Sequence, residues 1–170
     1  MEWTGARLAD RPTTEVRTWI AAAPEQVWPV VSDIERLPEA SSELHAVEWL
    51  DGASGPVLGA RFRGHNRNDV LGEWATTSHV IECDPGRAFA WAVQDPAEPN
   101  ATWRFVLAPK DGGTELAYRV RIGPGRSGLT MAVDRMPDKE QKIIYRRLCD
   151  LAENMDATLE HLKRRIERTA

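Results

Sequence analysis

Residues 137–166 read PDKEQKIIYRRLCDLAENMDATLEHLKRRI, and this stretch has the pattern of a long helix. Its apolar residues recur at steps of three or four, so they fall on one helical face. They are Ile144, Leu148, Leu151, Met155, Leu159, Leu162 and Ile166. Charged residues such as Arg146 and Glu153 fall on the other side, and Pro137 suits a first helical turn. The pattern therefore predicts an amphipathic helix that lies against another layer.

Short alternating segments before this helix predict that the other layer is an antiparallel sheet. Apolar and polar residues alternate within each segment, and Gly, Pro, Asn and Asp separate the segments. The expected strands cover residues 14–20, 44–50, 61–68, 72–82, 88–93, 103–107 and 116–122. Two short helices, beginning at Pro24 and near Ile34, separate the first two strands. Ser32 and Asp33 can cap the second, and we expect Asp33 to have an N-cap or helix-corner role. A third short helix-forming segment, around Met131 and Val133, follows the last strand.

Composition places the chain among ordinary globular proteins. Its 170 residues are 42% hydrophobic and 28% charged, which suits one domain over residues 1–170 with a flexible segment at residues 1–12. The formal net charge of −4 gives no broad basic surface for nucleic acid. No stretch has the apolar length of a signal or spanning segment, so we expect no stable membrane anchor.

The cysteines and histidines do not have the spacing of a metal site. Cys83 and Cys149 are the only cysteines, and we expect both to be free thiols, which suits a cytoplasmic location. None of the four histidines has a metal-ligand spacing. The Gly123-Pro124-Gly125 stretch lacks the lysine of a phosphate-binding loop. We therefore predict no metal and no cofactor.

Several segments together resemble the SRPBCC superfamily, the START and polyketide cyclase/dehydrase-like group. The resemblance starts at Ile20 and continues through residues 23–28 and 31–35. It extends to Val80, to residues 84–89, to the strand around Trp103 and to residues 113–114. The resemblance implies an α+β helix-grip fold, in which a curved antiparallel sheet of about seven strands wraps around a long C-terminal helix. It also implies a cavity for a hydrophobic ligand such as a lipid, sterol or polyketide.

The direction of strand side chains determines which residues line such a cavity. Arg63 and His65 share one face of their strand, and we expect solvent there because charged residues are seldom buried without partners. Val80 matches an inward position in the resembled superfamily, which implies that His79 points outward. Trp74, Thr76 and Ser78 then line the cavity. A one-residue error in register would reverse both sets.

Aromatic residues are the best candidates for a ligand-binding wall. The chain has seven tryptophans against three phenylalanines and two tyrosines, more indole rings than packing alone usually requires. Tyr118 and Trp103 carry polar tips that could orient an oxygen of the ligand. The full set of expected ligand-binding residues is Trp74, Thr76, Ser78, Phe89, Trp91, Trp103, Phe105, Tyr118, Met131, Met155 and Leu159.

Three functions fit this sequence. The first is a carrier or sensor that binds a small hydrophobic or amphipathic molecule without catalysis. The second is a cyclase, aromatase or dehydratase that uses the same cavity, with Arg63, His65, Ser78 and Tyr118 as the available hydrogen-bonding or proton-transferring groups. The third is a protein-interaction module that uses the charged face of the long helix. No pair of residues in the sequence forms a recognisable catalytic dyad.

Overall fold

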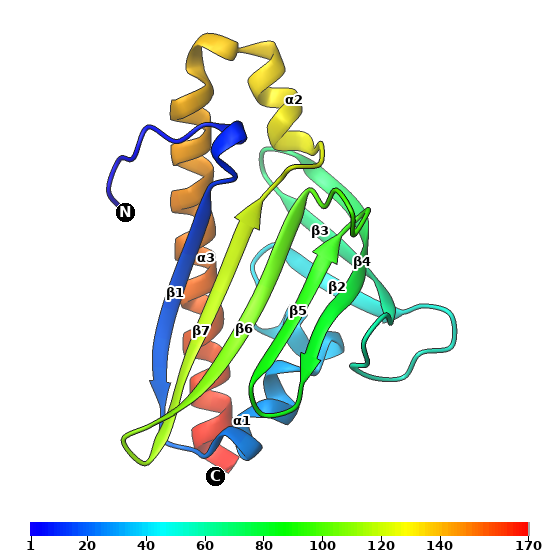
Figure 1. Cartoon of the computed structure of the whole chain (residues 1–170), viewed down its shortest axis with the longest axis vertical. Coiled ribbons are helices and arrows are strands. Elements are labelled where there is room, and N and C mark those ends of the chain that lie inside the picture. The colour runs from blue at the N-terminus through cyan, green and yellow to red at the C-terminus, as the bar shows by residue number, and fades with distance from the viewer. Residues whose placement is uncertain (170) are drawn as a thin grey trace.

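A single antiparallel sheet forms the body of the protein, whose computed structural model describes residues 1–169. The seven strands lie in the order β1-β7-β6-β5-β4-β3-β2 (Figure 1). They are β1 (Thr13–Ile20), β2 (Leu44–Trp49), β3 (Arg61–Asn68), β4 (Gly72–Asp84), β5 (Ala88–Val93), β6 (Ala101–Lys110) and β7 (Gly113–Ile122). All predicted strands are present, and the helix-grip α+β fold is confirmed.

The helices lie where the sequence pattern indicated, with small differences at their ends. They are α1 (Pro24–Val31), α2 (Gly128–Arg135) and α3 (Glu140–Thr169), with 3-10 turns η1 (Leu8–Asp10), η2 (Ile34–Glu39) and η3 (Pro137–Lys139). Pro137 therefore opens a 3-10 turn, and the long helix starts three residues later. Asp33 occupies the expected N-cap position of η2, but within residues 1–169 its side chain makes no capping hydrogen bond. Its ψ of 81° departs from the extended backbone that aims a capping side chain at the helix.

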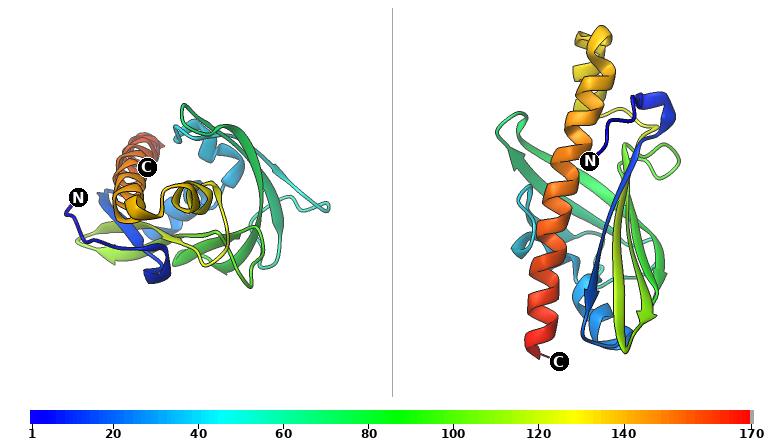
Figure 2. Two further views of the ribbon diagram at one scale, coloured as in Figure 1. Left: turned by 90° about the horizontal axis from the view of Figure 1, so that it is seen from above. Right: turned by 90° about the vertical axis from the view of Figure 1, so that its left-hand side faces the viewer.

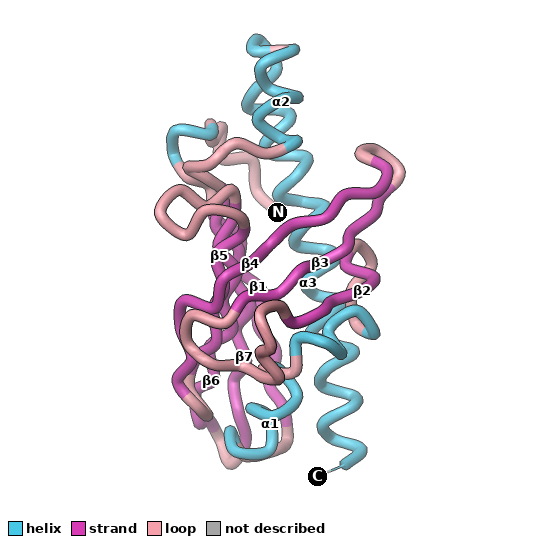
Figure 3. The backbone as a smooth tube through the Cα atoms, turned by 90° about the vertical axis from the view of Figure 1, so that its right-hand side faces the viewer, coloured by secondary structure: helices cyan, strands magenta, loops and turns pink. Residues whose placement is uncertain are grey.

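The apolar stripe of α3 is buried against the concave side of the sheet. All seven predicted stripe residues are buried, and Thr158 joins them. The strands curve around α2 and α3 when the molecule is seen from above (Figure 2). α3 packs most closely against β1, at one end of the strand order. The opposite end of the sheet, with β2, β3 and β4, passes across α3 on the other side of the molecule (Figure 3).

The register of β3 and β4 shows which side chains face the helix. Phe62 pairs with Ser78, and Gly64 pairs with Thr76. Phe62, Gly64 and Ser78 are buried, whereas Arg63 between them is exposed. The alternation therefore places Arg63 and His65 on the outer face, where His65 Nε2 lies 3.5 Å from a Glu48 carboxylate oxygen. His79, opposite Arg61, points to the same outer side.

The segment before β1 lies along the first turns of α3. Gln141 Nε2 donates a hydrogen bond to the Gly5 carbonyl oxygen at 2.7 Å, and the Trp3 ring meets the Tyr145 ring edge-on at 5.0 Å. Flexibility of residues 1–12 stays a prediction. Within residues 1–169, no helix is long and apolar enough to cross a membrane.

Candidate ligand-binding cavity

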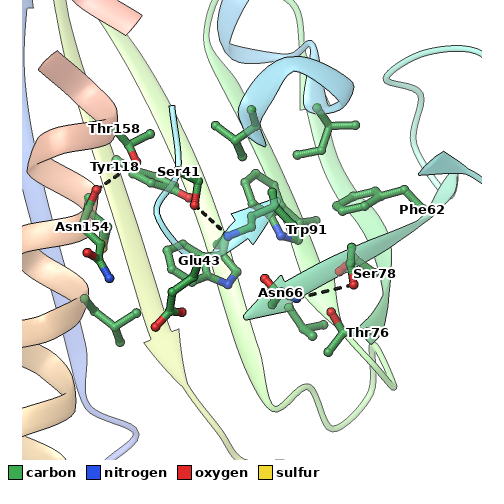
Figure 4. A pocket seen from close by; sticks show the side chains of 18 residues that line it. Ser41, Glu43, Phe62, Asn66, Thr76, Ser78, Trp91, Tyr118, Asn154 and Thr158 are labelled. Atoms are coloured by element: carbon green, nitrogen blue, oxygen red, sulfur yellow. Dashed lines mark hydrogen bonds between the residues drawn. The ribbon is translucent and has the colours of Figure 1, made fainter. Parts of the chain in front are cut away.

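Two adjoining spaces lie between the concave face of the sheet and the helices. The inner cavity has a volume of about 100 Å³, and the outer cleft has a volume of about 1200 Å³. They share several lining residues, namely Glu43, Asn66, Thr76, Val93, Trp103, Leu151 and Asn154. The inner cavity is drawn in Figure 4, with β-strand side chains on one side and α3 side chains on the other. A ligand in the cleft could therefore extend one end into the inner cavity.

Aromatic rings from four strands, β3, β5, β6 and β7, form one wall of the inner cavity. Trp91 of β5 pairs with Trp103 of β6, and their rings stack at 6.3 Å with an interplanar angle of 14°. The Tyr118 ring of β7 lies 5.4 Å from Trp103. Phe62 of β3 meets Trp91 edge-on at 6.0 Å. Because paired residues project to the same side of a sheet, these rings form a continuous apolar surface.

Polar side chains surround the rings. Asn66, Thr76 and Ser78 project from β3 and β4, and Asn154 and Thr158 project from α3 (Figure 4). The Thr158 hydroxyl is held locally, 2.9 Å from the Asn154 carbonyl oxygen and 3.0 Å from the Ala40 carbonyl oxygen. The cavity thus offers hydrogen-bonding groups beside a large apolar surface, which is the usual composition of a small-molecule site.

A partly buried ion pair lies where the two spaces meet. Arg147 of α3 donates to both carboxylate oxygens of Glu43, at 2.6 and 2.9 Å, and Asn68 Nδ2 donates to the same carboxylate at 3.1 Å. Burial alone would raise the pKa of Glu43, but the hydrogen bonds and charge of Arg147 outweigh burial and lower it. Glu43 therefore faces both spaces as a carboxylate with a matched countercharge.

The titratable side chains of the inner cavity have pKa values shifted away from neutral pH. Among the described residues that line it, Glu43 and Tyr118 are the only ones with titratable side chains. The pKa of Glu43 is lowered, and burial raises the pKa of Tyr118 well above its ordinary value of 10.0. At neutral pH the first is therefore an ion and the second a neutral phenol. Within residues 1–169, no three His, Cys, Asp or Glu side chains are grouped to hold a metal ion.

Comparison with known proteins identifies the family. Residues 11–167 match the family described as "Polyketide cyclase / dehydrase and lipid transport". The chain belongs to this family. The resemblance to the SRPBCC superfamily is thus confirmed. No curated protein matches the chain significantly.

Solved structures of similar proteins share the fold over nearly the whole chain. A polyketide cyclase-like protein from Corynebacterium glutamicum is 33% identical, with a TM-score of 0.66 over 95% of this chain and 93% of its own. A protein from Deinococcus radiodurans is 19% identical, with a TM-score of 0.63 over 94% and 99%. The di-domain ARO/CYC protein StfQ of the steffimycin biosynthetic pathway is 17% identical, with a TM-score of 0.70 over 92% of this chain and 51% of its own. The last two likenesses concern the fold alone.

Seven of the eleven expected ligand-binding residues line one of the two spaces. They are Trp74, Thr76, Ser78, Trp91, Trp103, Tyr118 and Met155. Trp74 lines the outer cleft, Thr76 and Trp103 line both spaces, and the other four line the inner cavity. That these residues bind a ligand stays a prediction.

The other four expected residues lie outside both linings. Phe89 and Phe105 are fully buried, and Phe89 packs edge-on against Trp28 of α1 at 6.3 Å. Both point to the concave side but lie beneath α1, where the core is filled. Leu159 is buried one helical turn beyond Met155. Met131, expected as part of a lid, is 53% exposed and points from α2 to solvent.

Sequence reasoning predicted Thr76, Ser78 and Tyr118 but missed other polar residues of the lining, Glu43, Asn66 and Asn154 among them. Glu43 precedes β2 in a loop, and its pairing with Arg147 spans 104 positions of sequence, so no local pattern could reveal it. Asn66 and Asn154 could have been found. Asn66 follows Phe62 and Gly64 in the alternation of β3, and Asn154 lies three residues after Leu151 on the buried side of α3.

Proposed function

We propose that this protein binds a small hydrophobic or amphipathic molecule between sheet and α3, as a carrier or sensor. The observation that carries the proposal is the lining itself. Aromatic rings and neutral polar groups surround the inner cavity, and among the described residues that line it only Glu43 and Tyr118 are titratable, the first an ion and the second a neutral phenol at neutral pH. Such a site supplies affinity and orientation without an acid or base. The two free cysteines support a cytoplasmic location for this activity.

Apolar burial is sufficient for useful affinity. A ligand that buries roughly 300 Å² of apolar surface gains on the order of 7 kcal/mol before the costs of association, at about 25 cal/mol per Å². The rings of Trp91 and Trp103 lie parallel, which suits contact with a flat ligand surface.

A cyclase-type enzyme is the second candidate, supported by the hydroxyl groups of Ser78 and Tyr118 in the inner cavity. Arg63 and His65, the other groups considered from sequence, lie on the outer face and cannot reach a substrate in this cavity. Catalysis would then depend on hydrogen bonds from neutral hydroxyls that hold a folded substrate and polarise its carbonyl groups.

Native mass spectrometry of gently purified protein tests ligand carriage directly. We expect a stoichiometric apolar molecule that is released and identified under denaturing conditions. Thr76→Trp should abolish this co-purification, because Thr76 borders both spaces and a large ring would fill their junction. Thr77→Trp is the matched control, since Thr77 pairs with Arg63 on the outer face.

A neutral fluorescent probe extends the test to protein without a co-purified ligand. Phenylnaphthylamine should brighten with the parent protein and with Thr77→Trp, but not with Thr76→Trp. Equal binding by both variants would show that the probe does not occupy this cavity. No binding to the parent, together with a clean apo mass, would count against carriage.

A further inference from the structure

Several polar groups that border the inner cavity have no partner within the protein. Among residues 1–169, no hydrogen bond involves the hydroxyl of Tyr118, Ser78 or Thr76, or the indole N–H of Trp91 or Trp103. Tyr118 and Ser78 are deeply buried, with exposed fractions of 5% and 2%. Buried polar groups in folded proteins are nearly always paired, so a set without partners requires an explanation.

These groups face open space rather than packed protein. Within residues 1–169, His79 Nδ1 is the single side-chain nitrogen or oxygen that is both fully enclosed and unpaired. The unpaired atoms of Tyr118, Ser78 and Trp91 therefore remain accessible, although their residues are buried. Because all three residues line the inner cavity, that cavity is the space their polar atoms border. Their partners must be supplied by whatever occupies it.

The character of these groups restricts the chemistry of the occupant. Indole N–H groups only donate, and Tyr118 stays a neutral phenol that donates readily. Acceptor oxygens are therefore required. An anion is disfavoured, because the Glu43 carboxylate faces the same cavity and its countercharge, Arg147, is already engaged by two hydrogen bonds. Among the residues lining the inner cavity there is no lysine, arginine or histidine.

We propose that the inner cavity binds a neutral, oxygen-bearing end of the ligand, a ketone, quinone or hydroxylated ring, which enters first. The apolar body then lies in the outer cleft, against side chains such as Trp74, Leu129 and Ile143. This orientation rests on the proposed binding function and adds to it the class of the ligand and its direction in the site. Tyr118 is the residue that distinguishes a carbonyl end from a hydrocarbon end.

Three ligands with one ring system test the proposal. The three compounds are substituted at the same ring position. Methyl naphthyl ketone carries a neutral hydrogen-bond acceptor, ethylnaphthalene carries no polar group, and naphthoate carries an anionic carboxylate. Affinities are measured by tryptophan quenching and by calorimetry. We expect the parent protein to bind the ketone at least tenfold more tightly than naphthoate. Tyr118→Phe should weaken ketone binding about five- to tenfold, the value of one hydrogen bond, and change ethylnaphthalene binding less than twofold.

Tyr145→Phe is the matched control, because Tyr145 is the only other tyrosine and donates to the Met1 carbonyl oxygen on the far side of α3. It should change none of the three affinities. Thermal unfolding of each variant shows that it is folded, and Ser78→Ala repeats the test should Tyr118→Phe unfold.

The outcomes separate this proposal from the binding function. Tyr118→Phe and Ser78→Ala could each change the affinities for the ketone and for ethylnaphthalene by the same factor. Water would then be the partner of the polar groups, and the proposed inward orientation of the oxygen-bearing end would be wrong. Binding of an apolar ligand would still stand. Tight binding of naphthoate would likewise reject the proposal that the end of the ligand in the inner cavity is neutral. Failure of the parent protein to bind any of the three would reject the binding function itself.

Discussion

The ring and the hydroxyl group of Tyr118 have different roles. Its ring stacks on Phe105 at 4.1 Å and belongs to the core, whereas its hydroxyl has no hydrogen-bond partner among residues 1–169. Tyr118→Phe should therefore leave the free energy of unfolding of the ligand-free protein unchanged or raise it by up to about 1 kcal/mol. Urea unfolding of both proteins measures the difference. A loss of more than about 1 kcal/mol would reveal a structural hydrogen bond to this hydroxyl.

Gly113 is required by the close approach of β7 to β1. A Cβ atom there would lie 2.3 Å from the Ile20 carbonyl oxygen and 2.8 Å from the Trp19 ring. Gly113→Ala should lower the free energy of unfolding by about 2–3 kcal/mol, because backbone and ring must both shift. Gly55→Ala is the control, since nothing lies within 4 Å of its added Cβ and its φ is not positive. A small effect of Gly113→Ala in urea unfolding would show that the strands separate easily at this point.

At the scale of elements, the sequence predicts the residues that follow a helix or strand period and does not predict those that follow no period. The stripe from Ile144 to Ile166 and the alternation of Trp74, Thr76 and Ser78 follow from helix and strand periods, and both were predicted correctly. Periodicity identifies a face but not the position along it where packing gives way to a cavity. For that reason Phe89 was assigned to the ligand wall although α1 covers it. The loop before β2 has no sequence periodicity, so the sequence does not predict that Glu43 lines the cavity.

The ion pair of Glu43 and Arg147 connects the start of β2 to the N-terminal third of α3. Arg147→Met should lower the free energy of unfolding by about 2 kcal/mol, because it leaves a partly buried carboxylate without its countercharge. The value lies below that of a fully buried pair, since the side chains retain 18% and 24% exposure. Arg146→Met is the matched control. Arg146 is 81% exposed and pairs with Asp150 at 3.3 Å, so its loss should cost less than about 0.5 kcal/mol.

The same pair makes stability depend on pH in a defined direction. The pKa of Glu43 is lowered in the folded protein below its ordinary value of 4.5. Its contribution is therefore present above about that value and is lost as pH falls through the folded pKa. The stability difference between the parent and Arg147→Met should shrink as pH decreases below 4.5. Urea unfolding at a series of pH values measures it. A constant difference down to strongly acidic pH would show that Arg147 acts through packing instead of charge.

At the scale of the whole molecule, the cavity follows from the way one helix meets a curved sheet. α3 packs closely against β1, and the sheet then curves through β7, β6 and β5 to β4 and β3. A straight helix cannot stay in contact with both ends of such a sheet, so space opens between α3 and the distal strands. Side chains fill this space near α1, where Phe89 and Phe105 are buried, and leave it open toward Trp103 and Trp74.

A ligand in this space connects parts of the molecule that otherwise have few contacts. Methyl naphthyl ketone at one hundred times its dissociation constant should raise the free energy of unfolding by about 2.7 kcal/mol, because it binds only the folded state. Hydrogen exchange should slow mainly in residues 61–84 and 147–158, the segments that contribute side chains to the two spaces, and little in the pairing of β1 with β7. Thr76→Trp should show neither effect. Uniform protection across the sheet would indicate that the ketone binds elsewhere and stabilises the fold only globally, since a ligand held between α3 and the distal strands must protect those elements first.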